Sequence, residues 1–316
     1  MSAQRSSIAF IFPGQGSQTI GMGKELADAF PIARETYAEA DQLLGFSLSR
    51  LAWDGPEEQL NDTINTQPAL LVQSIAVLRV LQAEYPDIQP AFVAGHSMGE
   101  ISALVSAGSL PFLDALKLAR RRGELMKSAG ENSPGGMAAI LGLDIPTIEM
   151  ICTNSSTSAE IVQVANDNCP GQVVISGASD ALLRAMEQAQ AAGARRVVRL
   201  AVSIAAHSPL MSHAQTDFNR AVDAAPLQDP HIPLVGNVTA QPLTNAHQIR
   251  QDLQAQLNTR VRWTESVQFM VRKGVSLFLE LGSEAVLTGL LKRIDRQVVG
   301  ISIGKPQDFE SLSNIK

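Results

Sequence analysis

Short apolar runs alternate with longer helical segments along the N-terminal part of the chain. The runs 8–12 and 91–94 predict buried strands, and the segments 23–44 and 68–84 have the periodicity of helices. Helical patterns continue to residue 127. Strand–turn–helix units in this order predict an α/β fold with a mostly parallel sheet.

The pattern changes between residues 133 and 202. Six short elements follow one another there as strand, helix, strand, strand, helix and strand, at 137–141, 146–152, 161–165, 173–176, 180–192 and 196–200. This β-α-β-β-α-β order predicts a ferredoxin-like subdomain inserted into the larger domain. The α/β pattern then returns, with helices from Pro209 and at 267–273 and strands at 234–238 and 277–281. We therefore expect a core of residues 1–132 and 203–316 and an insert of residues 133–202.

Composition narrows the class of protein. The chain has 316 residues, of which 45% are hydrophobic and 18% are charged, as in an ordinary soluble globular protein. The net charge of −6 argues against nucleic acid as a partner. The first apolar run is too short for a signal peptide, and no stretch is long enough to cross a bilayer. Two cysteines and five scattered histidines give neither a disulfide framework nor a metal site. We expect a cytoplasmic, metal-free monomer.

One serine lies between two glycines at a predicted strand–helix junction, in Gly95-His96-Ser97-Met98-Gly99. One interpretation is an ordinary tight turn, since glycine and serine are common turn residues. The other is a nucleophile elbow, in which only glycine fits on either side and the serine hydroxyl points outward. The Gly-x-Ser-x-Gly pattern alone is compatible with both interpretations.

A nucleophilic serine needs donors for the oxyanion that forms in the reaction. In an elbow the first donor is the backbone N–H after the nucleophile, here that of Met98. A second donor is expected from the glycine-rich turn 13–18 after the first strand, at the same edge of the sheet. This turn has a competing interpretation as a dinucleotide loop. Thr19 argues against it, because G-x-G-x-x-G requires glycine three positions after Gly16.

The serine also needs a base, and His207 is the strongest candidate. The apolar stretch 200–206 predicts a strand that ends at His207, while Ser208 as N-cap and Pro209 at the first helical position mark a helix start. A histidine at a strand end can face Ser97. The other histidines are expected to be solvated or to point away from the serine: His96, His213, His231 and His247.

A hydrolase triad would also include a carboxylate that orients the histidine. The candidates for this role are Asp144, Asp167 and Asp180. All three fall in the predicted insert, which is an awkward position from which to reach the histidine. A backbone carbonyl can fix the histidine tautomer instead.

Three consecutive arginines lie on an otherwise apolar helical segment after the elbow. A solvated basic face explains Arg120 and Arg121. Arg122, directly before Gly123, can instead turn inward and bind a carboxylate with its guanidinium. A serine nucleophile with such an arginine suits a dicarboxylic acyl thioester.

Taken together, these stretches of the sequence resemble a known family. The stretches "FPGQGSQTIGMG", "GHSMGE", "RRGELM", "HSPLM" and "QLNTRVRWTESV", together with "ANDNCPGQVVISG" and "ELGSEAVLTGLLKRI", are similar to the motifs of malonyl-CoA:acyl carrier protein transacylases. The resemblance extends from about residue 8 to about residue 294. It implies a hydrolase-like α/β core with a ferredoxin-like insert. It also implies malonyl-CoA and an acyl carrier protein as partners and no cofactor.

The resemblance assigns a role to each matching residue. The nucleophile and base fall on Ser97 and His207, and the malonate-binding arginine falls on Arg122. The remaining matches are the oxyanion-hole amides at Gln15 and Met98 and the backbone carbonyl that orients the histidine at Gln256.

Two positions depart from the family pattern. The family often has Ser or Phe directly before the catalytic histidine, a position associated with acyl-chain choice, and here it is Ala206. The smaller side chain is expected to leave room beside the acyl group, which relaxes malonyl selectivity. The usual "GPG" is Gly282-Ser283-Glu284, which we expect to alter a turn but not the chemistry.

Two other classes of function compete with acyl transfer. A serine hydrolase or thioesterase would use the same elbow but would call for an acidic triad member and give Arg122 no role. A non-catalytic interaction subunit would have no need of Ser97, His207 and Arg122 together. Among transferases, the sequence allows fatty acid synthesis, polyketide synthesis or the loading of a malonate decarboxylase.

Overall fold

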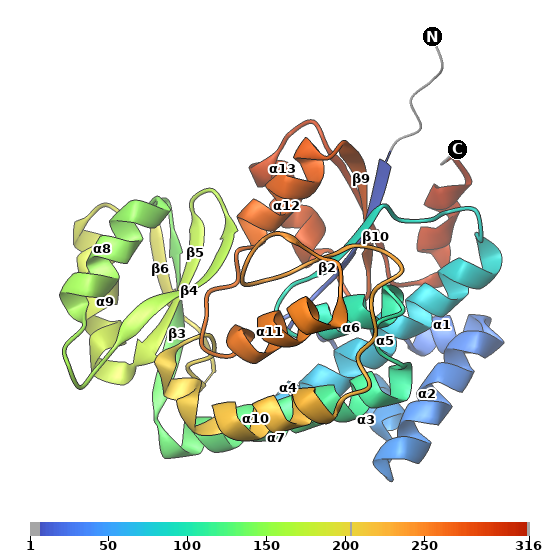
Figure 1. Cartoon of the computed structure of the whole chain (residues 1–316), viewed down its shortest axis with the longest axis horizontal. Coiled ribbons are helices and arrows are strands. Elements are labelled where there is room, and N and C mark those ends of the chain that lie inside the picture. The colour runs from blue at the N-terminus through green and yellow to red at the C-terminus, as the bar shows by residue number, and fades with distance from the viewer. Residues whose placement is uncertain (1–6, 203, 315–316) are drawn as a thin grey trace.

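The computed structural model describes residues 7–202 and 204–314 and has a six-stranded central sheet in the order β10–β9–β1–β2–β7–β8 (Figure 1). Neighbouring strands are parallel except for the antiparallel pair β7–β8. The strands are β1 (Ser7–Phe12), β2 (Phe92–Gly95), β7 (Leu234–Val235), β8 (Pro242–Leu243), β9 (Val275–Leu281) and β10 (Val299–Ile303). The predicted α/β class with a mostly parallel sheet is confirmed.

Both faces of this sheet are covered by helices, and the side chains of β1 alternate between them. Phe10 and Phe12 pack into the larger of two cores, whereas Ala9 and Ile11 pack into the smaller one. The larger core is covered by α1 (Lys24–Ala29), α2 (Pro31–Leu44), α3 (Leu48–Asp54), α4 (Glu57–Asn61), α5 (Thr63–Glu84), α6 (Gly99–Ser106), α7 (Phe112–Asn132), α10 (Ser212–Ala224) and α11 (Ala246–Gln256). The smaller core lies under α12 (Trp263–Arg272) and α13 (Val286–Ile294).

The insert has its own four-stranded antiparallel sheet in the order β4–β5–β3–β6. Its elements are β3 (Gly135–Leu141), α8 (Ile145–Ser155), β4 (Val162–Cys169), β5 (Gln172–Ala178), α9 (Ser179–Ala191) and β6 (Arg196–Arg199). The two helices pack on one face of the sheet. The predicted ferredoxin-like order is confirmed. The domain boundaries 1–132, 133–202 and 203–316 stay a prediction, and residues 1–6, 203, 315 and 316 lie outside the described part.

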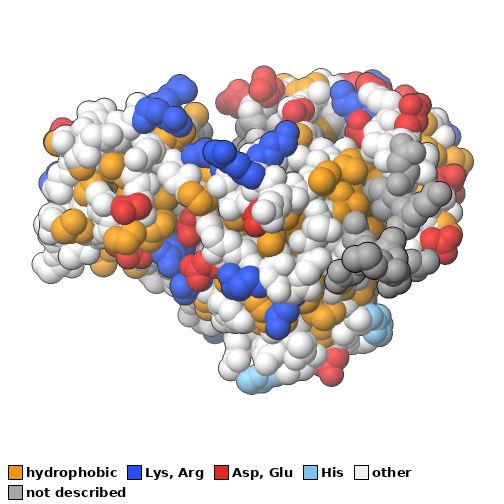
Figure 2. Space-filling model, turned by 90° about the horizontal axis from the view of Figure 1, so that it is seen from above, with side chains coloured by type: hydrophobic (Ala, Val, Ile, Leu, Met, Phe, Trp, Pro, Cys, Tyr) orange, Lys and Arg blue, Asp and Glu red, His pale blue; other side chains and the backbone are white. Residues whose placement is uncertain are grey.

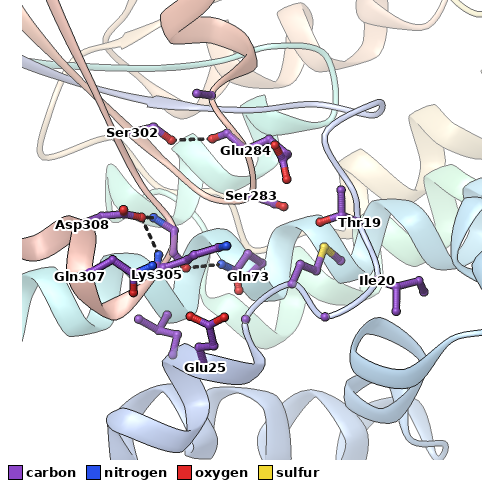
Figure 3. A pocket seen from close by; sticks show the side chains of 16 residues that line it. Thr19, Ile20, Glu25, Gln73, Ser283, Glu284, Ser302, Lys305, Gln307 and Asp308 are labelled. Atoms are coloured by element: carbon purple, nitrogen blue, oxygen red, sulfur yellow. Dashed lines mark hydrogen bonds between the residues drawn. The ribbon is translucent and has the colours of Figure 1, made fainter.

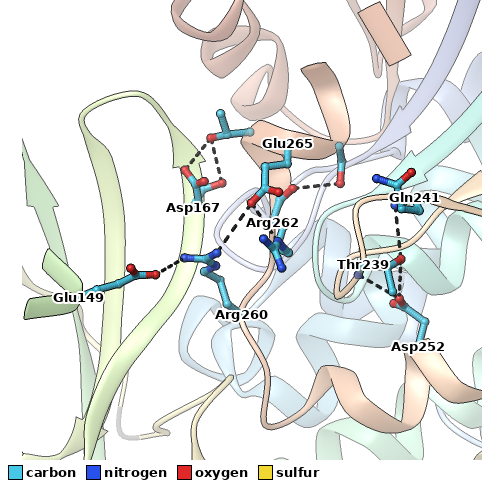
Figure 4. Close-up of polar contacts among 10 residues, drawn as sticks. Glu149, Asp167, Thr239, Gln241, Asp252, Arg260, Arg262 and Glu265 are labelled. Atoms are coloured by element: carbon cyan, nitrogen blue, oxygen red, sulfur yellow. Dashed lines mark hydrogen bonds and ion pairs between the residues drawn. The ribbon is translucent and has the colours of Figure 1, made fainter. Parts of the chain in front are cut away.

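The insert is joined to the core along β4. The backbone N–H of Asp167 donates to the carbonyl of Val261 over 2.9 Å, and the Val261 N–H donates to the carbonyl of Ala165 over 2.8 Å. An ion pair of 2.8 Å between Glu149 and Arg260 adds a contact from α8 (Figure 4). The surface is hollowed between the two lobes, with Lys and Arg side chains on one rim and along the floor of this notch and Asp and Glu side chains on the other rim (Figure 2).

Two predicted helices have different bounds in the structure. The segment 23–44 is not one helix, because the backbone of Phe30 is extended before Pro31 and separates α1 from α2. The helix α5 begins at Thr63 and contains Pro68 in its interior. The missing proline N–H leaves the carbonyl of Ile64 without its helical donor, and Arg120 Nη1 donates to that oxygen over 3.3 Å.

By length and composition alone, the helix α5 could cross a membrane. However, 83% of its most apolar stretch is buried inside the fold, as in the core helix of a globular protein.

Candidate active site

Ser97 lies in a tight turn between β2 and α6, with a left-handed backbone (φ 52°). A Cβ atom at Gly95 would overlap the carbonyl of Gly99, and one at Gly99 would overlap the carbonyl of Phe12. Only glycine fits at either position. The turn therefore has the geometry of a nucleophile elbow rather than of an ordinary surface turn.

The side chains of Ser97 and His207 meet although the two residues are 110 positions apart in the chain. Ser97 Oγ lies 2.8 Å from His207 Nε2, and His207 Nδ1 lies 2.8 Å from the backbone carbonyl oxygen of Gln256. A carbonyl only accepts hydrogen bonds, so Nδ1 carries the proton of the neutral ring and Nε2 is free to accept from the serine.

The strand predicted up to His207 is wrong. β6 ends at Arg199, and the described residues between it and His207 form irregular backbone. His207 itself has a left-handed backbone (φ 58°). Ser208 is the N-cap of the short 3₁₀ helix η1 (Pro209–Met211), and α10 follows it directly.

Burial and a neighbouring charge keep His207 neutral. Its side chain is buried, and burial lowers its pKa to about 3, with the positive charge of Arg122 as the second cause. Hydrogen bonding to the Gln256 carbonyl acts in the opposite direction but is weaker. At neutral pH the imidazole is therefore an unprotonated base.

Arg122 turns inward from α7 and is 1% exposed. Its Nη2 donates to Ser97 Oγ over 3.2 Å and to Gln256 Oε1 over 2.8 Å, and its Nη1 donates to Gln67 Oε1 over 2.9 Å. Burial lowers the pKa of Arg122 to about 10, so it stays cationic at neutral pH. A Cβ at Gly123 would lie 2.7 Å from the carbonyl oxygen of Thr63, so glycine lets α7 approach α5 closely here.

Arg120 and Arg121 lie toward the surface of α7. Arg121 pairs with Glu124 at the surface. Arg120 lies over the ring of Phe46 and also donates to Glu124. Neither approaches the serine.

Two backbone amides border the serine. Within residues 7–202 and 204–314, neither the Met98 N–H nor the Gln15 N–H has an acceptor in the protein. A Cβ at Gly14 would overlap the carbonyl of His96, so the turn that carries Gln15 packs directly against the elbow. Both amides are thus free to donate to a ligand atom, while the roles themselves stay predictions.

Three buried or partly buried polar residues near the serine could not be identified from the sequence. Asn237 Oδ1 accepts from the Ser97 N–H over 2.8 Å, and Gln163 Nε2 of the insert donates to the His207 carbonyl over 2.7 Å. Glu100 is completely buried and accepts from Gln256 Nε2. Glu100 belongs to the "GHSMGE" motif, which was the only signal that pointed to any of them.

The other histidines lie away from Ser97 Oγ. His213 and His231 are exposed, and so is His247, which lies in α11. His96 Nε2 lies 2.8 Å from Asn168 Oδ1 of the insert. Among the residues that the structure describes, no three His, Cys, Asp or Glu side chains are grouped as a metal site.

The turn that departs from the "GPG" pattern lines a separate cavity of about 510 Å³ (Figure 3). Glu284 has a left-handed backbone (φ 62°), and Ser302 Oγ donates to its carbonyl. The opposite wall includes Thr19 and Glu25. None of the predicted site residues lines this cavity.

Comparison with known proteins gives consistent matches. Residues 9–305 match the family model described as "Acyl transferase domain". The malonyl CoA-acyl carrier protein transacylase of Bacillus subtilis strain 168 is 43% identical over 96% of both chains. The transacylase of Escherichia coli strain K12 is also 43% identical, over 95% of this chain and 97% of its own.

Solved structures agree with these relatives. The malonyl CoA-acyl carrier protein transacylase of Coxiella burnetii has a TM-score of 0.96 at 38% identity and covers 100% of this chain and 99% of its own. A malonyl-transacylase solved in complex with a holo type II PKS acyl-carrier protein has a TM-score of 0.94 at 42% identity, covering 97% of this chain and 98% of its own.

Proposed function

The chain belongs to the acyl transferase domain family, and we propose that it moves a malonyl group from malonyl-CoA, through an acylated Ser97, to the phosphopantetheine thiol of an acyl carrier protein. One observation carries the substrate assignment. A buried cationic guanidinium, that of Arg122, lies 3.2 Å from the hydroxyl of Ser97. A carboxylate two bonds beyond the thioester carbonyl is the partner that such a group binds in parallel hydrogen bonds.

In the first half-reaction His207 Nε2 takes the proton of Ser97 Oγ, and the oxygen attacks the thioester carbonyl. The oxyanion is stabilised by the free amides of Gln15 and Met98. The tetrahedral intermediate collapses, the C–S bond breaks, and the imidazolium returns its proton to the coenzyme A thiolate. The Gln256 carbonyl accepts from Nδ1–H throughout and stabilises the imidazolium.

Substrate binding also prepares the base. The charge of Arg122 is one of the causes that lower the pKa of His207 in the free protein. A malonyl carboxylate bound to Arg122 offsets that charge and so raises the pKa of His207, while burial, the larger cause, still holds it below its ordinary value. His207 becomes a better proton acceptor when the correct acyl group is present.

The second half-reaction reverses these steps. His207 takes the proton of the phosphopantetheine thiol, and the thiolate attacks the malonyl ester of Ser97. The C–O bond to the serine breaks, and Oγ recovers the proton from the imidazolium. Neither half-reaction needs a cofactor.

The experiment that tests this proposal is incubation with malonyl-CoA in the presence and absence of a holo-acyl carrier protein. We expect malonyl-carrier protein to form at a rate well above the release of free malonate. Release of malonate at the same rate with and without carrier would instead indicate a thioesterase.

The transfer serves fatty acid or polyketide synthesis. Loading of a malonate decarboxylase is the alternative, and an assay that compares carriers from the three systems distinguishes them. The cytoplasmic location and the monomeric state stay predictions. Size-exclusion chromatography with light scattering tests the latter.

A further inference from the structure

The peptide groups on both sides of the left-handed Ser97 are held by side chains from distant parts of the chain. The Ser97 N–H donates to Asn237 Oδ1 over 2.8 Å, and the Ser97 carbonyl accepts from Gln256 Nε2 over 3.1 Å. Asn237 Nδ2 also donates to the carbonyl of Gly95 over 2.7 Å. Asn237 and Gln256 therefore hold the strained turn in place.

Glu100 bonds to both of these residues. It follows Ser97 by three positions on α6 and is 0% exposed. One carboxyl oxygen accepts from the backbone N–H of Asn237 over 3.2 Å, and the other accepts from Gln256 Nε2. Burial and the neighbouring carboxyl of Asp252 raise the pKa of Glu100.

The contact with Glu100 helps to fix which way the Gln256 amide faces, together with the Ser97 carbonyl and the Arg122 guanidinium. Gln256 Nε2 has two acceptors, the Glu100 carboxyl and the Ser97 carbonyl, while Oε1 accepts from Arg122 Nη2 over 2.8 Å. In the flipped orientation the NH₂ group would face the guanidinium, and two donors would be opposed without an acceptor. A buried donor without a partner is strongly unfavourable.

From these contacts we propose that Glu100 is a positioning residue for substrate selection: by orienting the Gln256 amide, it holds the Arg122 guanidinium where the malonyl carboxylate binds. This role rests on the proposed malonyl transfer. It differs from a merely structural one because the guanidinium that it holds in place binds the malonyl carboxylate, so its loss affects malonyl transfer more than acetyl transfer. An acetyl group, which lacks that carboxylate, does not use the guanidinium.

The test is the ratio of kcat/KM for malonyl-CoA to that for acetyl-CoA in Glu100→Gln. The new amide can present NH₂ to Gln256, which favours the flipped orientation and displaces Arg122. We expect the ratio to fall about tenfold, the equivalent of one charged hydrogen bond. Glu280→Gln is the matched control, because Glu280 on β9 is also 0% exposed and its carboxylate accepts the backbone N–H groups of Leu287 and Thr288 on α13. Its ratio should stay at the wild-type value.

A double-mutant cycle with Gln256→Met tests the route of the effect. Methionine has a similar size, keeps the backbone carbonyl and lacks the amide. If Glu100 acts through that amide, Glu100→Gln should change the ratio little once Gln256 is methionine. Additive effects of the two substitutions would contradict the proposal.

The remaining outcomes are also decisive. An equal fall for both thioesters in Glu100→Gln would overturn the selective role while leaving malonyl transfer intact. A wild-type protein without malonyl transfer would mean that the proposed function itself is wrong. If Glu100→Gln does not fold, Glu100→Asp replaces it, because the shorter carboxylate retreats from Gln256, and a ratio unchanged from wild type there would count against the proposal.

Discussion

Ser97 and His207 both have left-handed backbones, with φ values of 52° and 58°, and their side chains meet at 2.8 Å. Neither is glycine, so each conformation is unfavourable by itself and is held by its surroundings. Asn237 and Gln256 bond to the backbone of Ser97, and Gln163 bonds to the carbonyl of His207. The reactive pair is thus assembled by amide side chains from three other segments.

Replacing His207 should slow both half-reactions. Loss of a general base typically costs about 10²–10⁴ in rate, and we expect His207→Ala to slow acylation and transfer together by that amount. Rapid-quench kinetics of the two steps measures it. His213→Ala, an exposed histidine on α10, is the control and should behave as wild type. Similar losses in the two variants would refute the assignment of the base.

The pH dependence of stability should reflect the neutral, buried His207. The folded protein has a pKa of about 3 at this residue, against an ordinary value of 6.5 in the unfolded chain. Between these pH values the unfolded state binds one more proton than the folded state. The contribution of His207 to the free energy of unfolding is therefore fully present above about pH 6.5 and decreases as the pH falls toward about 3. One such proton contributes a slope of about 1.4 kcal/mol per pH unit.

Urea unfolding at about pH 7 and about pH 5 measures this slope. The variant His207→Gln should show a smaller loss of stability on acidification than wild type. The residual slope includes His96, whose pKa is also lowered by burial. Equal slopes in the two proteins would show that His207 titrates normally in the folded state.

Much of the fold and part of the site were predictable from local sequence. Gly95 and Gly99 marked the elbow, because a Cβ at either position would overlap backbone. Alternating apolar runs indicated both sheets. The contacts of Asn237 and Gln163 were not predictable, because they join residues 140 and 44 positions apart and depend on how the elements pack. The irregular backbone before His207 was also not predictable, because the apolar composition of residues 200–206 is typical of a buried strand.

Ala206 should permit acyl groups larger than malonyl. It is partly buried and packs against apolar side chains of the insert's inner face, among them Met137 and Val174. We expect the protein to use methylmalonyl-CoA. The variant Ala206→Phe should lower kcat/KM for methylmalonyl-CoA relative to kcat/KM for malonyl-CoA by about tenfold or more, because one methyl group in a filled pocket is worth about 1–3 kcal/mol. Steady-state kinetics with both thioesters checks this. An unchanged ratio would mean that the side chain at this position does not contact the acyl group.

Arg122→Ala should separate malonyl from acetyl transfer. A hydrogen bond to a charged group contributes about 1.5–3 kcal/mol, so malonyl turnover should fall by about one to two orders of magnitude. Acetyl transfer should be unchanged or improved, because the acetyl group has no carboxylate. Measurement of kcat/KM for both thioesters gives the answer. A parallel fall for both would show that Arg122 is structural.

The most direct test of the mechanism is the covalent intermediate on Ser97, on which both half-reactions depend. Intact-protein mass spectrometry after brief exposure to malonyl-CoA should show one added malonyl group on the wild-type protein. Addition of holo-acyl carrier protein should remove that group and leave it on the carrier. The label should be absent from Ser97→Ala, whereas a Ser97→Ala protein that acquires the malonyl group at the wild-type rate would contradict the mechanism.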